Sequence, residues 1–219
     1  MTVTGIDVPG DGPNIVEKAY DLLSENHDLS PVSVHLHKLI PIGAGLGGGS
    51  SDAAFALKLF NELFTLDLDD DKMMQYAARL GADCSFFIKN RPMLAQGIGE
   101  LLSDINVSLK GKFILMVYPN IHISTGEAYS KIVPKEPKIS IKTILEDSPI
   151  TEWKYQLVND FEEALFGGYP LLPHLKNMLY DHGALYAAMS GSGSCMFGIF
   201  DQEQVIDFGG DCKVWAGIL

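Results

Sequence analysis

Apolar positions in the first part of the chain alternate between the spacing of strands and that of helices. Residues 3–8 are typical of a short strand, and residues 9–13 form a Pro- and Gly-rich turn signal. From Asn14 onward the apolar residues recur at helical spacing, with Asn14 placed to cap the helix. Residues 32–37 alternate apolar and polar side chains, which predicts a half-buried strand.

Helical and strand-like segments continue through the middle of the chain. Dense apolar positions predict a helix over residues 53–63, and a second helix is expected over 72–80. Asp69, Asp70 and Asp71 precede that second helix, where carboxylates suit its positive end, so we interpret them as solvated capping residues. Short apolar runs predict buried strands at 85–88 and 113–118.

The last part of the chain repeats this mixture. Residues 134–149 have the composition of a surface connection. Helices are predicted over 160–166 and 171–181, and strands over 184–189 and 195–200. A domain boundary is expected near residues 105–112.

Composition limits the classes of partner. With 219 residues and 47% hydrophobic content, the chain is long enough for one large or two small domains. The formal charge of −12 argues against nucleic acid as a partner, because a phosphate backbone would be repelled. It does not exclude a nucleotide, since backbone amides bind phosphate locally.

Cysteines and the chain start bear on the compartment. Cys84, Cys195 and Cys212 are too widely spaced for a disulfide framework or a zinc site. His35 and His37 share a strand face, but no third ligand of suitable spacing is near, so we assign no metal site. The chain has no signal-peptide pattern and no apolar run of about 18 residues. We expect a soluble cytoplasmic protein that does not bind a membrane.

A glycine-rich loop follows the strand at 32–37. Five of the seven positions 43–49 are glycine, which is expected where main chain takes positive φ or approaches something closely. Loop amides and the free N–H groups of the following helix would form a cradle for a di- or triphosphate. Ser50 and Ser51 add hydroxyl groups for phosphate or Mg2+. The alternative is a tight turn that packs a helix on a sheet, which needs only one or two glycines.

Three better-known glycine loops fit poorly. Residues 43–48 match the short dinucleotide fingerprint, but about 20 residues further on the chain has a helix-cap context and not a strand end. The Walker A pattern fails because no lysine precedes Ser50. The protein-kinase set fails because there is no His-Arg-Asp or Asp-Phe-Gly triplet.

Residues 40–54, Ile-Pro-Ile-Gly-Ala-Gly-Leu-Gly-Gly-Gly-Ser-Ser-Asp-Ala-Ala, resemble the ATP loop of GHMP kinases. The triple glycine with Ser-Ser is similar in particular to the branch that phosphorylates a methylerythritol in isoprenoid synthesis. Further stretches agree in order and spacing, so that the resemblance covers nearly the whole chain: residues 80–87, 95–99, 159–162 and 189–194.

The resemblance implies an α+β fold in two parts. The first, residues 1–108, would be an ATP-binding domain like the second domain of ribosomal protein S5. The second, residues 109–219, would be a GHMP domain with a ferredoxin-like arrangement. Family members normally begin with a Lys-Ile-Asn type strand, whose lysine assists the catalytic aspartate, and a Gly-Tyr-His type segment that grips cytidine. This chain has neither, so we expect an N-terminally truncated first domain with an uncovered sheet edge.

The resemblance also assigns the ATP contacts. It places three residues at the adenosine part of ATP, namely Asn14, Ile15 and Lys38; a helix cap, a core residue and a surface cation remain their alternative roles. The loop positions that would hold the phosphates are Pro41, Gly43, Ala44, Gly45, Leu46, Gly47, Gly48, Gly49, Ser50 and Ser51.

By the same resemblance Asp83 is the catalytic residue and contacts the substrate, accepting or orienting the proton of the attacking hydroxyl. From the sequence alone, a turn or cap carboxylate is the competing interpretation. Thr125 and Tyr129 fall where the family contacts its cytidine-bearing substrate; a buried strand-edge tyrosine is the alternative for Tyr129. Residues 190–194 resemble a second glycine turn that helps to shape the phosphate site.

The implied activity is ATP- and Mg2+-dependent phosphorylation of the 2-hydroxyl of a small-molecule substrate, a cytidine diphosphate-linked methylerythritol. Two alternatives stay open. One is a catalytically impaired nucleotide-binding remnant, since the family's lysine is missing, and the other is a GHMP kinase for a different small alcohol. The sequence leaves the oligomeric state open.

Overall fold

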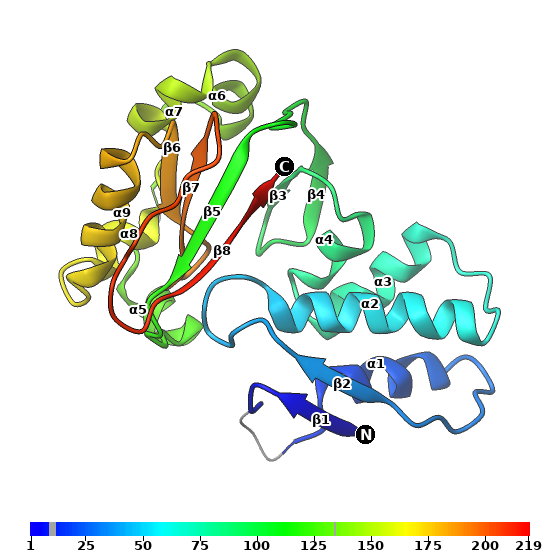
Figure 1. Ribbon diagram of the computed structural model, residues 1–219. Coiled ribbons are helices and arrows are strands. Elements are labelled where there is room, and N and C mark those ends of the chain that lie inside the picture. Colours follow the sequence, from blue (N-terminus) through cyan, green and yellow to red (C-terminus); the bar gives the residue numbers. More distant parts are fainter. Residues whose placement is uncertain (9–11, 134) are drawn as a thin grey trace. The chain divides into compact units, whose positions relative to one another are not determined.

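The computed structural model describes residues 1–8, 12–133 and 135–219, and these form two compact units (Figure 1). Unit 1 comprises residues 1–42 and 47–105, and unit 2 comprises residues 43–46 and 106–219. The predicted turn at residues 9–13 lies largely outside the described residues, as does Pro134.

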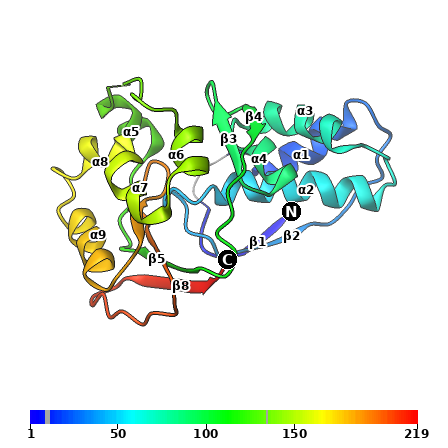
Figure 2. The same ribbon diagram turned by 90° about the horizontal axis from the view of Figure 1, so that it is seen from above.

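Unit 1 is built around a group of helices (Figure 2). Its members are α1 (Ile15–Ser24), α2 (Gly48–Leu63), α3 (Asp70–Leu80) and α4 (Cys84–Lys89). Small residues along α2, such as Ala53 and Ala54, are fully buried and let the neighbouring helices approach closely. Phe60 and Leu57 fill the same core. This packing fixes α2, the helix that follows the glycine loop.

Two small sheets complete unit 1. The parallel pair consists of β1 (Thr2–Gly5) and β2 (His35–Lys38), and the antiparallel pair of β3 (Met93–Gln96) and β4 (Leu101–Asp104). All four residues of β1 are exposed, and among the described strands β1 pairs only with β2. On β2, His35 and His37 share a hydrogen bond partner, the hydroxyl of Thr4, at 2.8 and 2.9 Å.

Unit 2 contains an antiparallel sheet of four strands. They are β5 (Phe113–Tyr118), β6 (Tyr186–Met189), β7 (Met196–Phe200) and β8 (Lys213–Ile218), in the order β6-β7-β5-β8. β5 and β6 run in the same direction with β7 between them, which is the split βαβ arrangement of ferredoxin-like folds. The predicted α+β class is therefore confirmed.

Helices lie on both faces of this sheet at β6. Alternate residues of a strand point to opposite faces. Tyr186 and Ala188 pack with α6 (Ile141–Asp147) and α7 (Ile150–Gln156). Ala187 and Met189 share the core formed with α9 (Leu171–Asp181). Two short helices, α5 (Thr125–Lys131) and α8 (Asp160–Leu165), complete unit 2.

Two expectations about elements were wrong. Residues 85–88 belong to the helix α4 and not to a strand: Cys84, Ser85 and Ile88 are its buried residues, and the Ser85 hydroxyl donates to the Met74 carbonyl at 3.0 Å. An apolar run of four residues fits either element, so periodicity did not separate them. The segment 134–149 is not only a surface connection, because it contains α6, which Ser140 caps and Ile144 anchors.

The other caps and elements follow the sequence closely. Asn14 forms a capping box with Glu17, as its side chain accepts from the backbone while Glu17 accepts from the Asn14 N–H at 2.9 Å. Asp69 caps α3 by accepting from the Lys72 N–H at 2.9 Å. The helix predicted over 171–181 has those bounds in the structure.

Candidate active site

The first half of the glycine loop, residues 43–46, is held by other residues of unit 2. The Cys195 N–H donates to the Ala44 carbonyl at 3.0 Å, and the Ser190 hydroxyl donates to the Gly45 carbonyl at 2.8 Å. Gly45 has φ of +73°, and a Cβ there would lie 1.9 Å from the Ser190 carbonyl oxygen. At Gly43 a Cβ would lie 2.2 Å from the His122 ring. Both glycines are thus required by the protein's own contacts.

The second half of the loop, residues 47–51, begins α2 in unit 1. Gly47 is the N-cap with φ of 62°, and no side chain caps the helix. Gly49 is exposed, and a Cβ there would meet no atom within 4 Å. An uncapped helix start with open space above a glycine suits close approach of an anion to backbone amides.

Lys38 supplies a positive charge at this helix start. Its ammonium lies 3.1 Å from the position a Cβ on Gly48 would take. It is only 3% exposed and is paired with Asp52, the distance between Lys38 Nζ and Asp52 Oδ2 being 2.5 Å. The alternative of a surface cation is therefore wrong for Lys38. Sequence reasoning missed Asp52 as its partner, although Asp52 stands in the quoted loop motif directly after the two serines.

Asp83 occupies the N-cap position of α4, but its side chain makes no capping hydrogen bond. It is exposed, although the next residue, Cys84, is fully buried. Gly99 has φ of +116°, and a Cβ there would lie 3.1 Å from Asp83 Oδ1. The turn at residues 96–99 therefore leaves room at this carboxylate. The structure gives no support to a capping role for Asp83.

Ser50 and Cys84 join the start of α2 to the start of α4. Burial raises the pKa of the Cys84 thiol, a hydrogen bond with the Ser50 side chain lowers it, and the Asp83 charge raises it. These contacts place Ser50 in the second half of the loop close to the residue that follows Asp83. Ser51, the next residue of α2, is half-buried.

Asn14 and Ile15 begin α1 in unit 1. The Asn14 side chain accepts a hydrogen bond from the Val16 N–H at 3.0 Å, so Asn14 caps α1. Ile15 is half-buried against the core of unit 1. Their role toward adenosine stays a prediction.

Thr125 and Tyr129 lie on α5 in unit 2. Thr125 is the first residue of the helix, which Ser124 caps. Tyr129 is 61% exposed and meets the ring of Phe161 edge-on, with centroids 5.0 Å apart. The alternative of a buried strand-edge tyrosine is wrong, and an exposed ring face suits stacking with a planar base.

No group of three or more His, Cys, Asp or Glu side chains in the described ranges is placed to hold a metal ion. In the same part of the chain, no helix has the length and apolar character needed to cross a membrane.

Family models match both parts of the chain. The GHMP kinases N terminal domain matches residues 14–91, and the GHMP kinases C terminal model matches residues 152–209. The first match includes the glycine loop and Asp83, and the second includes the turn at 190–194.

Curated relatives are similar over most of their length. A 4-diphosphocytidyl-2-C-methyl-D-erythritol kinase of Bacteroides fragilis is 50% identical over 204 residues, which are 93% of this chain and 74% of the relative. The enzyme of the same name from Parabacteroides distasonis is 45% identical over 227 residues, covering 100% of this chain and 82% of the relative.

Solved structures agree on the fold. A crystal structure of 4-(cytidine 5'-diphospho)-2C-methyl-D-erythritol kinase matches with a TM-score of 0.73 and 30% identity, over 90% of this chain and 72% of the other. A homoserine kinase from Cytophaga hutchinsonii has the same TM-score at 16% identity, covering 100% of this chain and 81% of the other. At this identity the likeness shows only the fold. The chain belongs to the GHMP kinases and, within them, to the 4-diphosphocytidyl-2-C-methyl-D-erythritol kinase family.

Proposed function

We propose that this ATP-dependent kinase transfers the γ-phosphoryl group of ATP to the 2-hydroxyl of 4-diphosphocytidyl-2-C-methyl-D-erythritol. A relative with that substrate in its name is 50% identical to the chain over 204 residues. Homoserine and mevalonate kinases share only the fold at 16% identity. The substrate proposal therefore rests on the methylerythritol branch of the family.

One observation carries the proposed mechanism. The hydrogen bond between the Ser50 and Cys84 side chains joins the uncapped start of α2 to the residue beside Asp83. A phosphate on the α2 amides would then lie on the same side of unit 1 as a free carboxylate. Phosphoryl transfer needs this pairing of an anion cradle with a group that orients the nucleophile.

The step forms a bond between the substrate's hydroxyl oxygen and the γ-phosphorus, and it breaks the bond between that phosphorus and the oxygen of ADP. Asp83 accepts or orients the proton that leaves the hydroxyl. Backbone amides of residues 48–50 face the negative charge of the transferred group. No protein nucleophile takes part.

Mg2+ fits the residues present. It is usually held by one or two carboxylates together with substrate phosphates, and not by an all-protein cage. Asp83 and the hydroxyls of Ser50 and Ser51 are oxygen donors near the proposed phosphate position, and Mg2+ bound there would neutralise phosphate charge. Thr125 and Tyr129 are proposed to contact the substrate, Tyr129 through its exposed ring. All three cysteines are free thiols, which favours a cytoplasmic site of action.

The test is ATP-dependent phosphorylation of the cytidyl methylerythritol substrate by the chain and by Asp83→Asn. We expect kcat to fall by about 10²–10⁴-fold in Asp83→Asn, with the melting temperature retained. Asp181→Asn, at the exposed end of α9, is the matched control and should keep full activity.

Homoserine and mevalonate serve as competing substrates in the same assay. Turnover of either in preference to the cytidyl compound would overturn the substrate proposal. Equal activity of Asp83→Asn and the unchanged chain would overturn the role of Asp83. Binding of ATP without turnover of any of the three alcohols would favour the nucleotide-binding remnant.

A further inference from the structure

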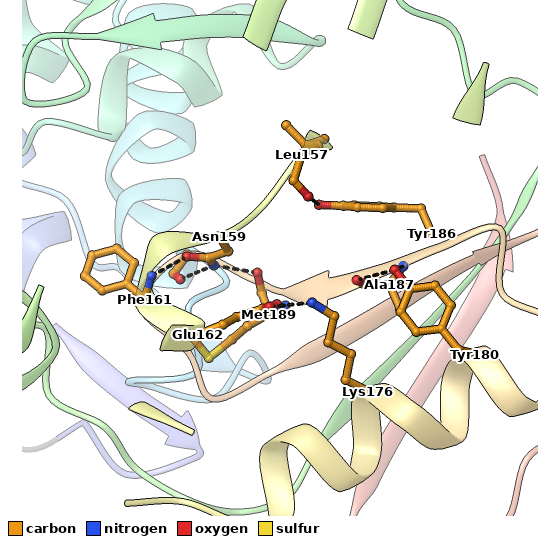
Figure 3. A network of polar contacts seen from close by, with 10 residues as sticks. Leu157, Asn159, Phe161, Glu162, Lys176, Tyr180, Tyr186, Ala187 and Met189 are labelled. Atoms are coloured by element: carbon orange, nitrogen blue, oxygen red, sulfur yellow. Dashed lines mark hydrogen bonds and ion pairs between the residues drawn. The ribbon is translucent and has the colours of Figure 1, made fainter. Parts of the chain in front are cut away.

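A polar network at the start of α8 holds the end of strand β6 (Figure 3). The Asn159 side-chain amide donates to two carbonyl oxygens, those of Met189 and Gly191, each at 2.8 Å. Glu162 accepts from the Met189 N–H at 2.8 Å and is paired with Lys176. Both backbone groups of Met189 are thus bound by side chains of one short stretch, residues 159–162.

The oxygen of Asn159 is also used. It accepts from the Phe161 N–H at 3.0 Å and so caps α8. With one acceptor atom facing an N–H and one donor group facing two carbonyls, the orientation of the amide is set by its partners. The residue joins a helix start to a turn, and only asparagine combines a short reach with both roles.

The turn that Asn159 holds is the one that grips the glycine loop. Residues 190–194 start directly after Met189, and the Ser190 hydroxyl and the Cys195 N–H bind the carbonyls of Gly45 and Ala44. The Gly193 N–H closes the turn on the Ser190 carbonyl at 3.0 Å. All these groups belong to unit 2.

We propose that Asn159, supported by Glu162, is a positioning residue for ATP binding: it fixes the turn at 190–194, and this turn fixes the first half of the glycine loop. The inference rests on the proposed function. Residues 43–46 continue covalently into the amides at the start of α2. A displaced turn therefore changes where the phosphate-binding amides lie, although Asn159 touches neither ATP nor the alcohol.

Asn159→Asp separates the two roles of the side chain. Aspartate keeps the cap on Phe161, because it offers the same acceptor. It replaces the amide donor with an oxygen that faces two carbonyls, which leaves both without a partner. Asn159→Ser is the milder variant, since serine also caps helices but is too short to reach the turn.

The matched control is Ser140→Ala. Ser140 caps α6 in the same unit by accepting from the Thr143 N–H, and it touches no part of the turn at 190–194. It therefore measures what the loss of one helix cap does by itself.

Two measurements are made on the full chain. Calorimetric titration with ATP should show affinity at least about tenfold weaker in Asn159→Asp than in the unchanged chain, a loss of about 1.4 kcal/mol or more, and less than twofold changed in Ser140→Ala. In steady-state kinetics KM for ATP should rise about as much, whereas KM for the alcohol should change less than twofold. Amide exchange followed by mass spectrometry should show faster exchange of the peptides that contain Gly193 and Cys195 in Asn159→Asp only.

The outcomes are distinguishable. Unchanged exchange at Gly193 and Cys195 in Asn159→Asp would overturn the inference whether or not the chain is a kinase. Equal weakening of ATP binding by Ser140→Ala would also overturn it, because the effect would then be general destabilisation. An unchanged chain that binds no ATP would overturn the proposed function, and the inference with it.

Discussion

The two halves of the glycine loop differ at Gly45 and Gly49. In the first half, residues 43–46, the protein itself fills the space: a Cβ on Gly45 would lie 1.9 Å from a backbone oxygen. In the second half, residues 47–51, Gly49 has nothing within 4 Å of a Cβ. The first half is thus explained by internal packing. The second half contains a glycine for which the folded chain alone gives no reason.

That difference predicts how substitutions divide. Changes in the first half and in the turn that holds it should lower the free energy of unfolding, because they disturb contacts inside unit 2. Changes at Gly49 should not lower the free energy of unfolding. They should weaken the binding of the ligand, because only the ligand needs the space. A single loop motif therefore contains a folding requirement and a binding requirement.

Gly45→Ala should have the largest effect on stability. The new methyl group meets the Ser190 carbonyl, and alanine resists φ of +73°, so that overpacking and backbone strain together should cost about 3–4 kcal/mol. Urea unfolding measures the loss. Gly167→Ala is the control, since a Cβ there meets nothing within 4 Å. Equal stability of the two variants would break the comparison between the halves.

Lys176→Met tests the buried support of the turn. Glu162 is buried, its side chain being 6% exposed, and without Lys176 it would keep an unpaired charge that should cost about 3 kcal/mol of unfolding free energy. The double variant Glu162→Gln, Lys176→Met should recover most of that loss, because glutamine still accepts from the Met189 N–H. The exposed Lys110→Met serves as control. A double variant no more stable than Lys176→Met would show that charge pairing is not the cause.

The sequence predicted features that depend on one chain segment, and it missed contacts between residues that are distant in the sequence. The glycine loop, the Asn14 cap and the helix over 171–181 are local patterns, so a single chain segment carries their signal. The buried pair of Lys38 with Asp52 joins residues 14 positions apart in different elements, and no local pattern predicts it.

Short helices and strands were also missed. β8 (Lys213–Ile218) and α7 (Ile150–Gln156) were not predicted, because each is only six or seven residues long, which is too short for a clear periodic pattern. Their places are decided by pairing with β5 and by the burial of Trp153. The hydrogen bonds of Asn159 were missed for a different reason, because they reach Met189 and Gly191 about 30 residues away.

Gly49→Ala should show the opposite behaviour to Gly45→Ala. Alanine favours a helical first turn over glycine, so the free energy of unfolding should rise by about 0.5 kcal/mol. The added methyl group projects into the space where phosphate would approach, and ATP affinity should fall about tenfold, or about 1.4 kcal/mol. Calorimetric titration and urea unfolding on the same preparation give both numbers. If Gly49→Ala binds ATP as tightly as the unchanged chain, the need for ligand space does not explain this glycine.

Two buried thiols extend the comparison to pH. Cys195 belongs to the side that holds the first half of the loop, and burial raises its pKa to about 12. Cys84 lies beside the second half, where a hydrogen bond with Ser50 opposes the effect of burial on its pKa. A thiol whose folded pKa is raised stabilises the fold fully below its unfolded pKa of 9.0, and that contribution is lost as pH rises from there toward the folded pKa.

For Cys195 the loss between pH 7.5 and 9.5 should be about 0.8 kcal/mol. Cys195→Ala should remove this part of the alkaline decline in unfolding free energy. Cys84→Ala should remove less, because the hydrogen bond with Ser50 opposes the rise that burial causes in the pKa of Cys84. Urea unfolding at the two pH values measures both slopes. If the decline stays the same in Cys195→Ala, the thiol beside the first half of the loop does not titrate as its burial requires.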